Sequence, residues 1–283
     1  MNGDSAELSR RQVLVTALGS GFALATTPVS AQTIGTNTDG LEAGEVKIPT
    51  AWGDIPAYRA LPKQGKRHPL LLVVQEIFGV HEHIKDVCRR LAKKGYFAIA
   101  PELFARQGDV SKLSDVAEIR KIVAQVPDAQ VLSDLDACVA WAKTTDRADP
   151  EKLGITGFCW GGRITWLYAA HSSALRAGVA WYGRLTGDKN HVTPQHPLDI
   201  APKLHAPVLG LYGEEDQGIP VASVKEMEAA LKEGSSAARR SQIKLYPQAG
   251  HAFFADYRPQ YRKAAADDGY KRMLGWFSAN GVL

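Results

Sequence analysis

A cysteine stands at the centre of a short turn bracketed by glycines, Gly157-Phe-Cys159-Trp-Gly161. The apolar run 153–158 before it predicts a strand, and the segment 163–170 after it predicts a helix. A strand, a sharp turn and a helix with this spacing are typical of a nucleophile elbow, here with a thiol in place of a hydroxyl. The glycines suit so tight a turn, because larger side chains would clash there. The pattern predicts a nucleophilic thiol, and a buried structural cysteine is the alternative.

An acidic turn and a histidine follow the last two predicted strands. The turn 213–220 comes after the apolar strand 207–212, and His251 comes after the strand 242–246. Nucleophile, acid and histidine thus occur in the chain order of α/β-hydrolases. We select Asp216 as the acid that orients the histidine, with Glu215 as the second candidate. A solvated loop histidine without a catalytic role is the alternative.

Two further charged residues follow the other central strands. Glu76 comes directly after the apolar strand 69–75, where an unpaired carboxylate would be poorly hydrated, so we expect a functional role for it. Arg106 follows the strand 96–100 and has the geometry to bind a carboxylate through two parallel hydrogen bonds. The alternatives are a capping or ion-paired glutamate and an ordinary surface arginine.

His81-Glu82-His83 raises the question of a metal site. Two histidines at positions i and i+2 diverge on a helix surface, since only i+3 and i+4 neighbours share a face. No third ligand stands out nearby, so we expect these residues to border the pocket, and we expect no metal and no other cofactor. The elbow glycines are not a phosphate loop either, because the Lys-Ser/Thr of that motif is missing.

The predicted strands and helices alternate along the chain, which is typical of a mostly parallel sheet with helices on both faces. A β-hairpin is predicted first, from the segments 44–49 and 55–61. Ligands of such α/β folds bind at the carboxyl ends of the strands, where the residues above fall. The remaining predicted elements are a strand at 177–181 and helices at 81–94, 132–143, 222–232 and 261–278.

Length and composition describe a globular chain that is long enough for one large α/β domain or two small ones. It has 283 residues, of which 45% are hydrophobic and 23% charged, with a formal net charge of +4. This charge is too small and too dispersed to indicate nucleic acid or an anionic membrane as partner. Cys88 and Cys138 lie in helical patterns and are expected in the core, although a disulfide between them is open. No hydrophobic face stands out as a subunit interface, so we expect a monomer.

The N-terminus predicts an export signal. Arg10-Arg11 precedes a short apolar stretch at 13–25, and Val29-Ser30-Ala31 has the small-x-small pattern of a cleavage site. The apolar stretch is too short to span a membrane stably, and no span is expected in the mature chain. We expect residues 1–31 to be removed after export by the twin-arginine translocase, which leaves an α/β domain at 32–283 in the periplasm. A surface N-terminal helix is the alternative.

Five blocks in order resemble the dienelactone hydrolase family, which contains carboxymethylenebutenolidases and adopts the α/β-hydrolase fold. The resemblance implies a triad of Cys159, His251 and Asp216, with Glu76 as a switch that helps generate the thiolate. It implies an oxyanion hole from the backbone N–H groups of Trp160 and Ile77, and a substrate contact from Arg106. We also select Phe78 and Arg258 as candidate substrate-binding residues. The five blocks are Gln75-Glu-Ile-Phe-Gly79, Pro101-Glu-Leu-Phe-Ala-Arg-Gln107, Gly157-Phe-Cys-Trp-Gly-Gly162, the turn 213–220 and Gly250-His-Ala-Phe-Phe254.

One position departs from the family pattern. The dienelactone enzymes carry a second carboxylate-binding arginine four residues after the catalytic histidine, and here that position is Ala255. Arg258 or Arg184 is a substitute from another direction. The resemblance therefore implies a hydrolase of carboxylic esters or lactones that forms an acyl-thioester on Cys159. A thioesterase or acyl-transfer enzyme on the same triad, and a non-catalytic thiol sensor or binding module, are the alternatives.

The export hypothesis predicts that replacing both Arg10 and Arg11 by lysine leaves the precursor in the cytoplasm, because the translocase reads the arginine pair. Cell fractionation followed by immunoblotting measures this. Normal appearance of the processed protein in the periplasm would refute the assignment.

Overall fold

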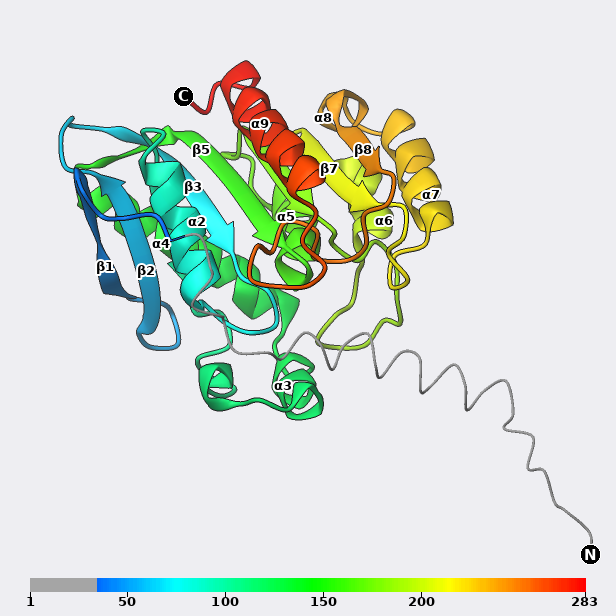
Figure 1. Cartoon of the computed structure of the whole chain (residues 1–283), viewed down its shortest axis with the longest axis horizontal. Coiled ribbons are helices and arrows are strands. Elements are labelled where there is room, and N and C mark those ends of the chain that lie inside the picture. The colour runs from blue at the N-terminus through cyan, green and yellow to red at the C-terminus, as the bar shows by residue number, and fades with distance from the viewer. Residues whose placement is uncertain (1–34) are drawn as a thin grey trace, which may run out of the picture.

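The computed structural model shown in Figure 1 describes residues 35–283. The expected signal segment 1–31, on which the export prediction depends, lies outside the described residues. Eight strands build one sheet in the order β1-β2-β4-β3-β5-β6-β7-β8. The pairs β1–β2 and β2–β4 are antiparallel, and all other pairs are parallel. The strands are β1 (Leu41–Ile48), β2 (Ile55–Pro62), β3 (His68–Val74), β4 (Phe97–Pro101), β5 (Ala148–Phe158), β6 (Ala177–Trp181), β7 (Val208–Gly213) and β8 (Gln242–Tyr246).

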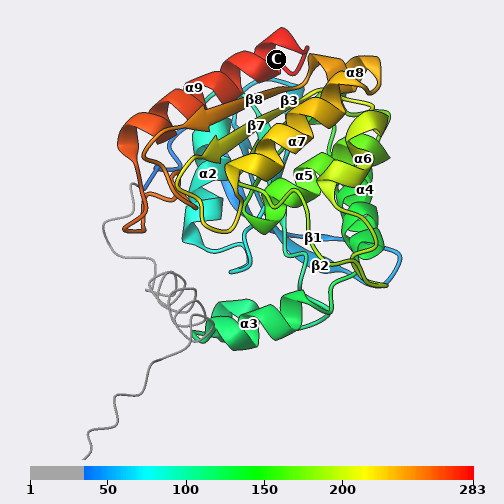
Figure 2. The same ribbon diagram turned by 90° about the vertical axis from the view of Figure 1, so that its right-hand side faces the viewer.

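Helices cover both faces of the sheet. α2 (Glu82–Ala92) and α9 (Lys263–Ala279) lie on one face, and α4 (Asp128–Thr144), α5 (Trp160–His171) and α7 (Val221–Lys232) lie on the other (Figures 1 and 2). The fold class predicted from the sequence is therefore confirmed. The remaining short elements are α3 (Val116–Val123), α6 (Pro197–Ile200), α8 (Ser236–Arg240) and the 3₁₀ turns at Val110–Lys112 and Ala201–Lys203.

The central strands are apolar because both of their faces are covered. In β3, residues 70–74 are completely buried, and every residue of β4 and β6 is buried as well. Cys88 and Cys138 belong to this core and are free thiols, so the expected core positions are confirmed and no disulfide joins them. Within residues 35–283 no helix is both long and apolar enough to cross a membrane.

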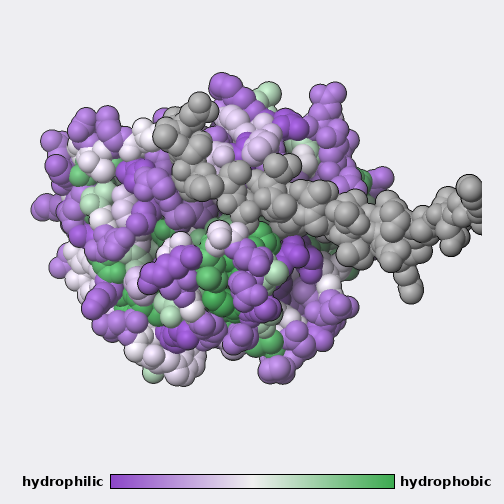
Figure 3. Space-filling model, turned by 60° about the horizontal axis from the view of Figure 1, so that its bottom comes forward, coloured by the Kyte–Doolittle hydropathy of each residue, from purple (hydrophilic) through white to green (hydrophobic). Residues whose placement is uncertain are grey.

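The parallel strands run toward the lower side of the molecule in Figure 1. Figure 3 brings that side forward and shows hydrophobic surface gathered in its middle, bordered by hydrophilic side chains. A binding site for a small ligand is expected on this side, because the loops that follow parallel strands meet there.

α4 begins four residues earlier than its hydrophobic pattern predicts. It starts at Asp128, directly after Pro127, and the Asp128 carboxylate is buried. Both carboxylate oxygens accept hydrogen bonds from the Arg163 guanidinium, each at 2.7 Å. This long-range partner on α5 has no signature in the local sequence, which explains the difference.

α5 begins three residues earlier than predicted, and its first turn contains Gly161 and Gly162. Glycine disfavours a helix interior, but here the helix packs directly on strand backbone. A Cβ atom on Gly161 would lie 2.4 Å from the Val74 carbonyl oxygen, and one on Gly162 would lie 2.4 Å from that of Trp181. The glycines therefore let the start of α5 approach the ends of β3 and β6.

This close approach predicts that Gly162→Ala lowers the free energy of unfolding by about 1–3 kcal/mol, the usual cost of forced overpacking. Gly275→Ala is the matched control, because Gly275 is an exposed glycine of α9 with open space around it. That control should gain roughly 0.5–1 kcal/mol from the better helix propensity of alanine. Urea unfolding measures both, and equal stability of the two variants would contradict the packing argument.

Candidate active site

Cys159 lies at the junction of β5 and α5 in a strained conformation. Its φ and ψ angles are 56° and −113°, which only a few non-glycine residues adopt. Its N–H donates to the Trp181 carbonyl at 3.0 Å, and its side chain is half-buried. Trp160 is the first residue of α5, so its N–H has no acceptor within the helix. A thiolate at this position would be favoured by the positive end of the helix dipole.

His251 and Asp216 are joined beside this cysteine. The imidazole Nδ1 lies 2.7 Å from an Asp216 carboxylate oxygen, and the other oxygen of Asp216 accepts from the Gly218 N–H at 2.9 Å. Asp216 is buried, whereas Glu214 and Glu215 are exposed. The geometry therefore selects Asp216 from the three acids of the turn.

The electrostatics of His251 are set by these two neighbours. Burial alone would lower its pKa, but negative charge on the Cys159 sulfur and the hydrogen bond that the ring donates to Asp216 outweigh burial and raise the pKa to about 10. The same ring has a hydrogen-bonding contact with the Cys159 thiol. Side chains that follow β5, β7 and β8 thus meet as the sequence order suggested.

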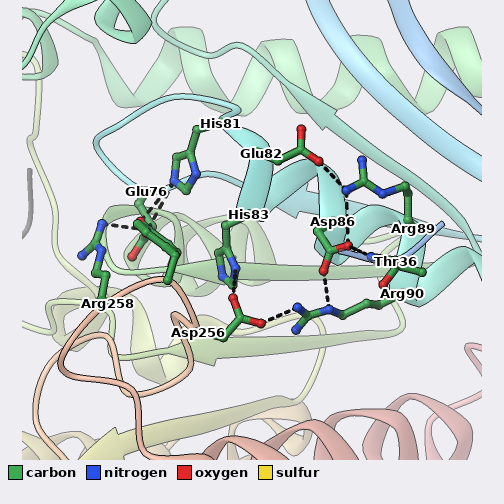
Figure 4. A network of polar contacts seen from close by, with 11 residues as sticks. Thr36, Glu76, His81, Glu82, His83, Asp86, Arg89, Arg90, Asp256 and Arg258 are labelled. Carbon is green, nitrogen blue, oxygen red and sulfur yellow. Dashed lines mark hydrogen bonds and ion pairs between the residues drawn. The ribbon is translucent and has the colours of Figure 1, made fainter. Parts of the chain in front are cut away.

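Glu76 lies in a buried cage directly after β3 (Figure 4). One carboxylate oxygen accepts from the Tyr257 hydroxyl at 2.9 Å and from the Arg258 guanidinium at 3.1 Å, and it lies 3.5 Å from His81 Nε2. Burial would raise the pKa of Glu76, but the charge of Arg258 and the contact with His81 hold it well below its usual range. Glu76 is therefore an ionised carboxylate in this structure.

The two histidines of the His-Glu-His segment do not diverge as expected. Their rings stack, with centroids 6.1 Å apart and an interplanar angle of 19°. The i+2 argument fails because His81 precedes α2 with an extended backbone, so helical spacing does not apply to it. His83 is fully buried rather than at the border of a pocket, while His81 contacts Glu76. Among residues 35–283 no group of three His, Cys, Asp or Glu side chains is arranged for a metal ion.

Ion pairs anchor to α2 the loop whose Tyr257 and Arg258 side chains contact Glu76. His83 Nδ1 lies 3.1 Å from a carboxylate oxygen of Asp256, and the other Asp256 oxygen pairs with Arg90 of α2 (Figure 4). Arg90 Nε is also 2.5 Å from Asp86. Asp256 directly precedes Tyr257 and Arg258 in the sequence. The loop that carries these two residues is therefore anchored to α2.

Arg106 is engaged by a buried carboxylate. Its guanidinium donates two hydrogen bonds to Asp134 at 2.7 and 3.0 Å and a third to the Thr50 hydroxyl. It also stacks at 5.6 Å from the ring of Trp52, an exposed side chain. Arg106, which we expected to bind a substrate carboxylate, is thus already paired with the carboxylate of Asp134.

The remaining expected residues lie around Glu76. Phe78 packs under the guanidinium of Arg258, 4.6 Å from the ring centroid. Ile77 is nearly buried in the tight turn that the Glu76–Gly79 bridge closes. Arg184 is exposed after β6.

Three important contacts escaped the sequence analysis: Tyr257 and His81 on Glu76, and Asp134 on Arg106. The Tyr257 and Asp134 contacts join segments far apart in the chain, whereas His81 reaches Glu76 across a turn of only a few residues. The Tyr257-Arg258 pair shortly after His251 is the one signal that would have found the first contact.

The fold and the Cys-His-Asp arrangement at the strand ends define an α/β-hydrolase. The sequence model of the dienelactone hydrolase family matches residues 55–281, and the chain belongs to that family. Its similarity to members of this family identifies the chain as a hydrolase of esters or lactones.

Similar proteins span nearly the whole chain. A protein of Methylorubrum extorquens named as a candidate carboxymethylenebutenolidase is 62% identical over 277 residues, covering 97% of this chain and 94% of its own. A protein of Escherichia coli with the same name is 52% identical over 270 residues, covering 95% and 98%. A crystal structure from Klebsiella pneumoniae described as a candidate dienelactone hydrolase has 53% identity and a TM-score of 0.81, covering 84% of this chain and 98% of that one.

The Asp216–His251 pair predicts a specific pH dependence. The charge of Cys159 and the hydrogen bond to Asp216 raise the folded-state pKa of His251 to about 10, above the ordinary value of roughly 6.5. These contacts therefore stabilise the fold in full below a pH of about 6.5. This stabilisation is lost as the pH rises through about 10. Asp216→Asn should lower the His251 pKa. The difference in free energy of unfolding between the wild type and this variant should therefore shrink as the pH rises from about 6.5 to about 10.

NMR titration of the His251 ring measures the pKa shift directly. Asp136→Asn is the control, since Asp136 pairs with the exposed His171 at 2.7 Å. The control should leave the His251 titration unchanged, and an equally unchanged titration in Asp216→Asn would contradict the assignment.

Proposed function

We propose that this hydrolase cleaves carboxylic esters or lactones through an acyl-thioester on Cys159. The observation that carries the proposal is the convergence of Cys159, His251 and Asp216 at one end of the sheet, with the 2.7 Å contact between the latter two. A nucleophile, a base in contact with it and a carboxylate that orients the base are the parts that acyl transfer requires.

The chemistry follows from these parts. The Cys159 thiolate attacks the ester carbonyl carbon and forms a C–S bond, and collapse of the tetrahedral intermediate breaks the C–O bond. The leaving oxygen takes a proton from His251. Water then attacks the thioester and gives a proton to the imidazole, the C–S bond breaks, and the carboxylic acid is released with a regenerated thiolate.

The backbone supports this reaction at the carbonyl oxygen. The N–H groups of Trp160, at the start of α5, and of Ile77, in the turn after β3, are the proposed oxyanion hole. Such preorganised donors stabilise the negative charge that develops on the oxygen. A thiolate is itself a good leaving group, so the tetrahedral intermediate goes on to the thioester only when the ester oxygen leaves more readily than sulfur. Activated esters and enol lactones therefore suit this site best.

We assign Glu76 the role of a switch that takes the thiol proton when substrate binds. In the structure its charge is satisfied by Arg258, and a carboxylate with a depressed pKa is a weak base. The switch therefore requires substrate to separate Glu76 from Arg258.

Arg258, Phe78 and Arg106 are the proposed substrate contacts. Both arginines are paired with protein carboxylates, Arg258 with Glu76 and Arg106 with Asp134. A substrate carboxylate would have to compete with these pairs, whereas an uncharged ester or lactone would not. A substrate carboxylate that pairs with Arg258 would separate Glu76 from it, as the switch requires, whereas Arg106 is already paired with Asp134. We further propose that the enzyme works as a monomer in the periplasm after twin-arginine export.

A substrate panel tests the proposal: cis-dienelactone, a neutral enol lactone and a nitrophenyl acetate. Cys159→Ala should lose at least about a thousandfold in turnover on every hydrolysed substrate, because the residue forms the covalent bond. Cys138→Ala is the matched control, a buried free thiol of the core, and should retain activity. Turnover by Cys159→Ala at the wild-type rate would refute the mechanism.

The switch role predicts that Glu76→Gln acylates more slowly, by about tenfold to a hundredfold, because glutamine cannot accept the thiol proton. Stopped-flow release of nitrophenolate in the first turnover measures the acylation rate. An unchanged burst rate, with the fold confirmed by circular dichroism, would remove Glu76 from the reaction.

A further inference from the structure

Glu102 is a charged residue at the strand ends to which the proposed reaction gives no role. It is the first residue after β4, it is half-buried, and its N–H donates to the Pro56 carbonyl of β2 at 2.8 Å. Its carboxylate accepts a hydrogen bond from the Val80 N–H, in the segment that follows β3. Since β3 and β4 are parallel neighbours, Glu102 joins the carboxyl ends of two adjacent strands.

The segment that Glu102 contacts is the tight turn after β3. A bridge between Glu76 and Gly79 closes this turn, and Ile77 and Phe78 are the two residues between them. Gly79 has a φ of 76°, and a Cβ atom there would lie 3.1 Å from each carboxylate oxygen of Glu102. The turn that carries Ile77 therefore packs directly on this carboxylate.

The charge of Glu102 is stabilised mainly by this turn. Burial raises the pKa of the carboxyl group, and the hydrogen bond from Val80 is the strongest interaction that opposes the rise. The buried carboxylates of Glu76 and Asp134, by contrast, are each paired with an arginine. A hydrogen bond to a charged acceptor is about twice as strong as one between neutral groups. The contact with Val80 is therefore a strong restraint on the backbone of the turn.

We propose that Glu102 is a positioning residue, which holds the turn after β3 so that the Ile77 N–H meets the carbonyl oxygen of the substrate. This inference rests on the proposed function, because Ile77 is an oxyanion donor only if Cys159 attacks a carbonyl group. Removal of one oxyanion donor costs about a hundredfold to a thousandfold in kcat. Displacement of the donor, which loosening of the turn would cause, costs a part of that.

Glu102→Ala removes the acceptor, and two reactions of Cys159 separate the consequences. Acylation by nitrophenyl acetate develops negative charge on a carbonyl oxygen, whereas alkylation by iodoacetamide displaces iodide from a methylene carbon and develops none. Acylation, measured by stopped flow in the first turnover, should slow about tenfold to a hundredfold, and kcat should fall with little change in KM. Alkylation follows the thiolate fraction and should stay within about threefold of the wild type, since Glu76 keeps its contacts with Tyr257 and Arg258.

Two control variants accompany this test. Glu102→Gln is the conservative change, because its amide oxygen still serves as an acceptor for the Val80 N–H, and acylation should stay within about threefold of the wild type. Glu151→Ala removes an exposed carboxylate near the start of β5, at the other end of the sheet, and should leave both rates unchanged.

Glu102→Asp is the second test variant if Glu102→Ala does not fold, because it keeps the charge but withdraws the carboxylate by one methylene group. Unchanged acylation in the folded variant would overturn the proposal. An equal loss of acylation and alkylation would overturn it as well, since the defect would then lie in the thiolate and not at the carbonyl oxygen. Failure of the proposed function has a different signature, because Cys159→Ala would then hydrolyse the ester at the wild-type rate.

Discussion

The site depends on the direct contact between the start of α5 and the backbone at the ends of β3 and β6. Gly161 and Gly162 permit this contact, since any Cβ atom would collide with strand carbonyl oxygens. The contact places Cys159 on a strained turn with its N–H on the Trp181 carbonyl. The same arrangement sets the N-terminus of α5 under the thiol and places Tyr182 against His251. The geometry and the electrostatics of the proposed nucleophile therefore have one structural origin.

Charge compensation is the second principle of the molecule. The buried carboxylates of Glu76, Asp134 and Asp256 each have a cationic partner, namely Arg258, Arg106 and Arg90. Removal of either partner would leave an uncompensated buried charge, which is far costlier than the pair itself. The arrangement keeps Glu76 ionised beside the proposed catalytic centre. It also anchors the 255–258 loop to α2, which holds Tyr257 and Arg258 beside Glu76.

Much of the fold and of the proposed triad could be predicted from the local sequence. The alternation of apolar strands and helices predicted the sheet, and β6 has the predicted bounds because its apolar run is complete in itself. Cys159, Asp216 and His251 were found because each follows a strand, and parallel strand ends must meet. Contacts set by tertiary packing could not be read in this way. The start of α4 depends on the Asp128–Arg163 pair, the stacking of His81 on His83 depends on where α2 begins, and Arg106 meets Asp134 across 28 positions of sequence.

The central claim is that the acyl group is carried by the sulfur of Cys159. Rapid quenching of wild-type protein with nitrophenyl acetate during the first turnover, followed by peptide mapping by mass spectrometry, measures this directly. The account predicts an acetyl group on the peptide that contains Cys159 and its removal by neutral hydroxylamine, as expected of a thioester. A first-turnover burst with the acetyl group on another residue, or with no acylated peptide at all, would contradict it.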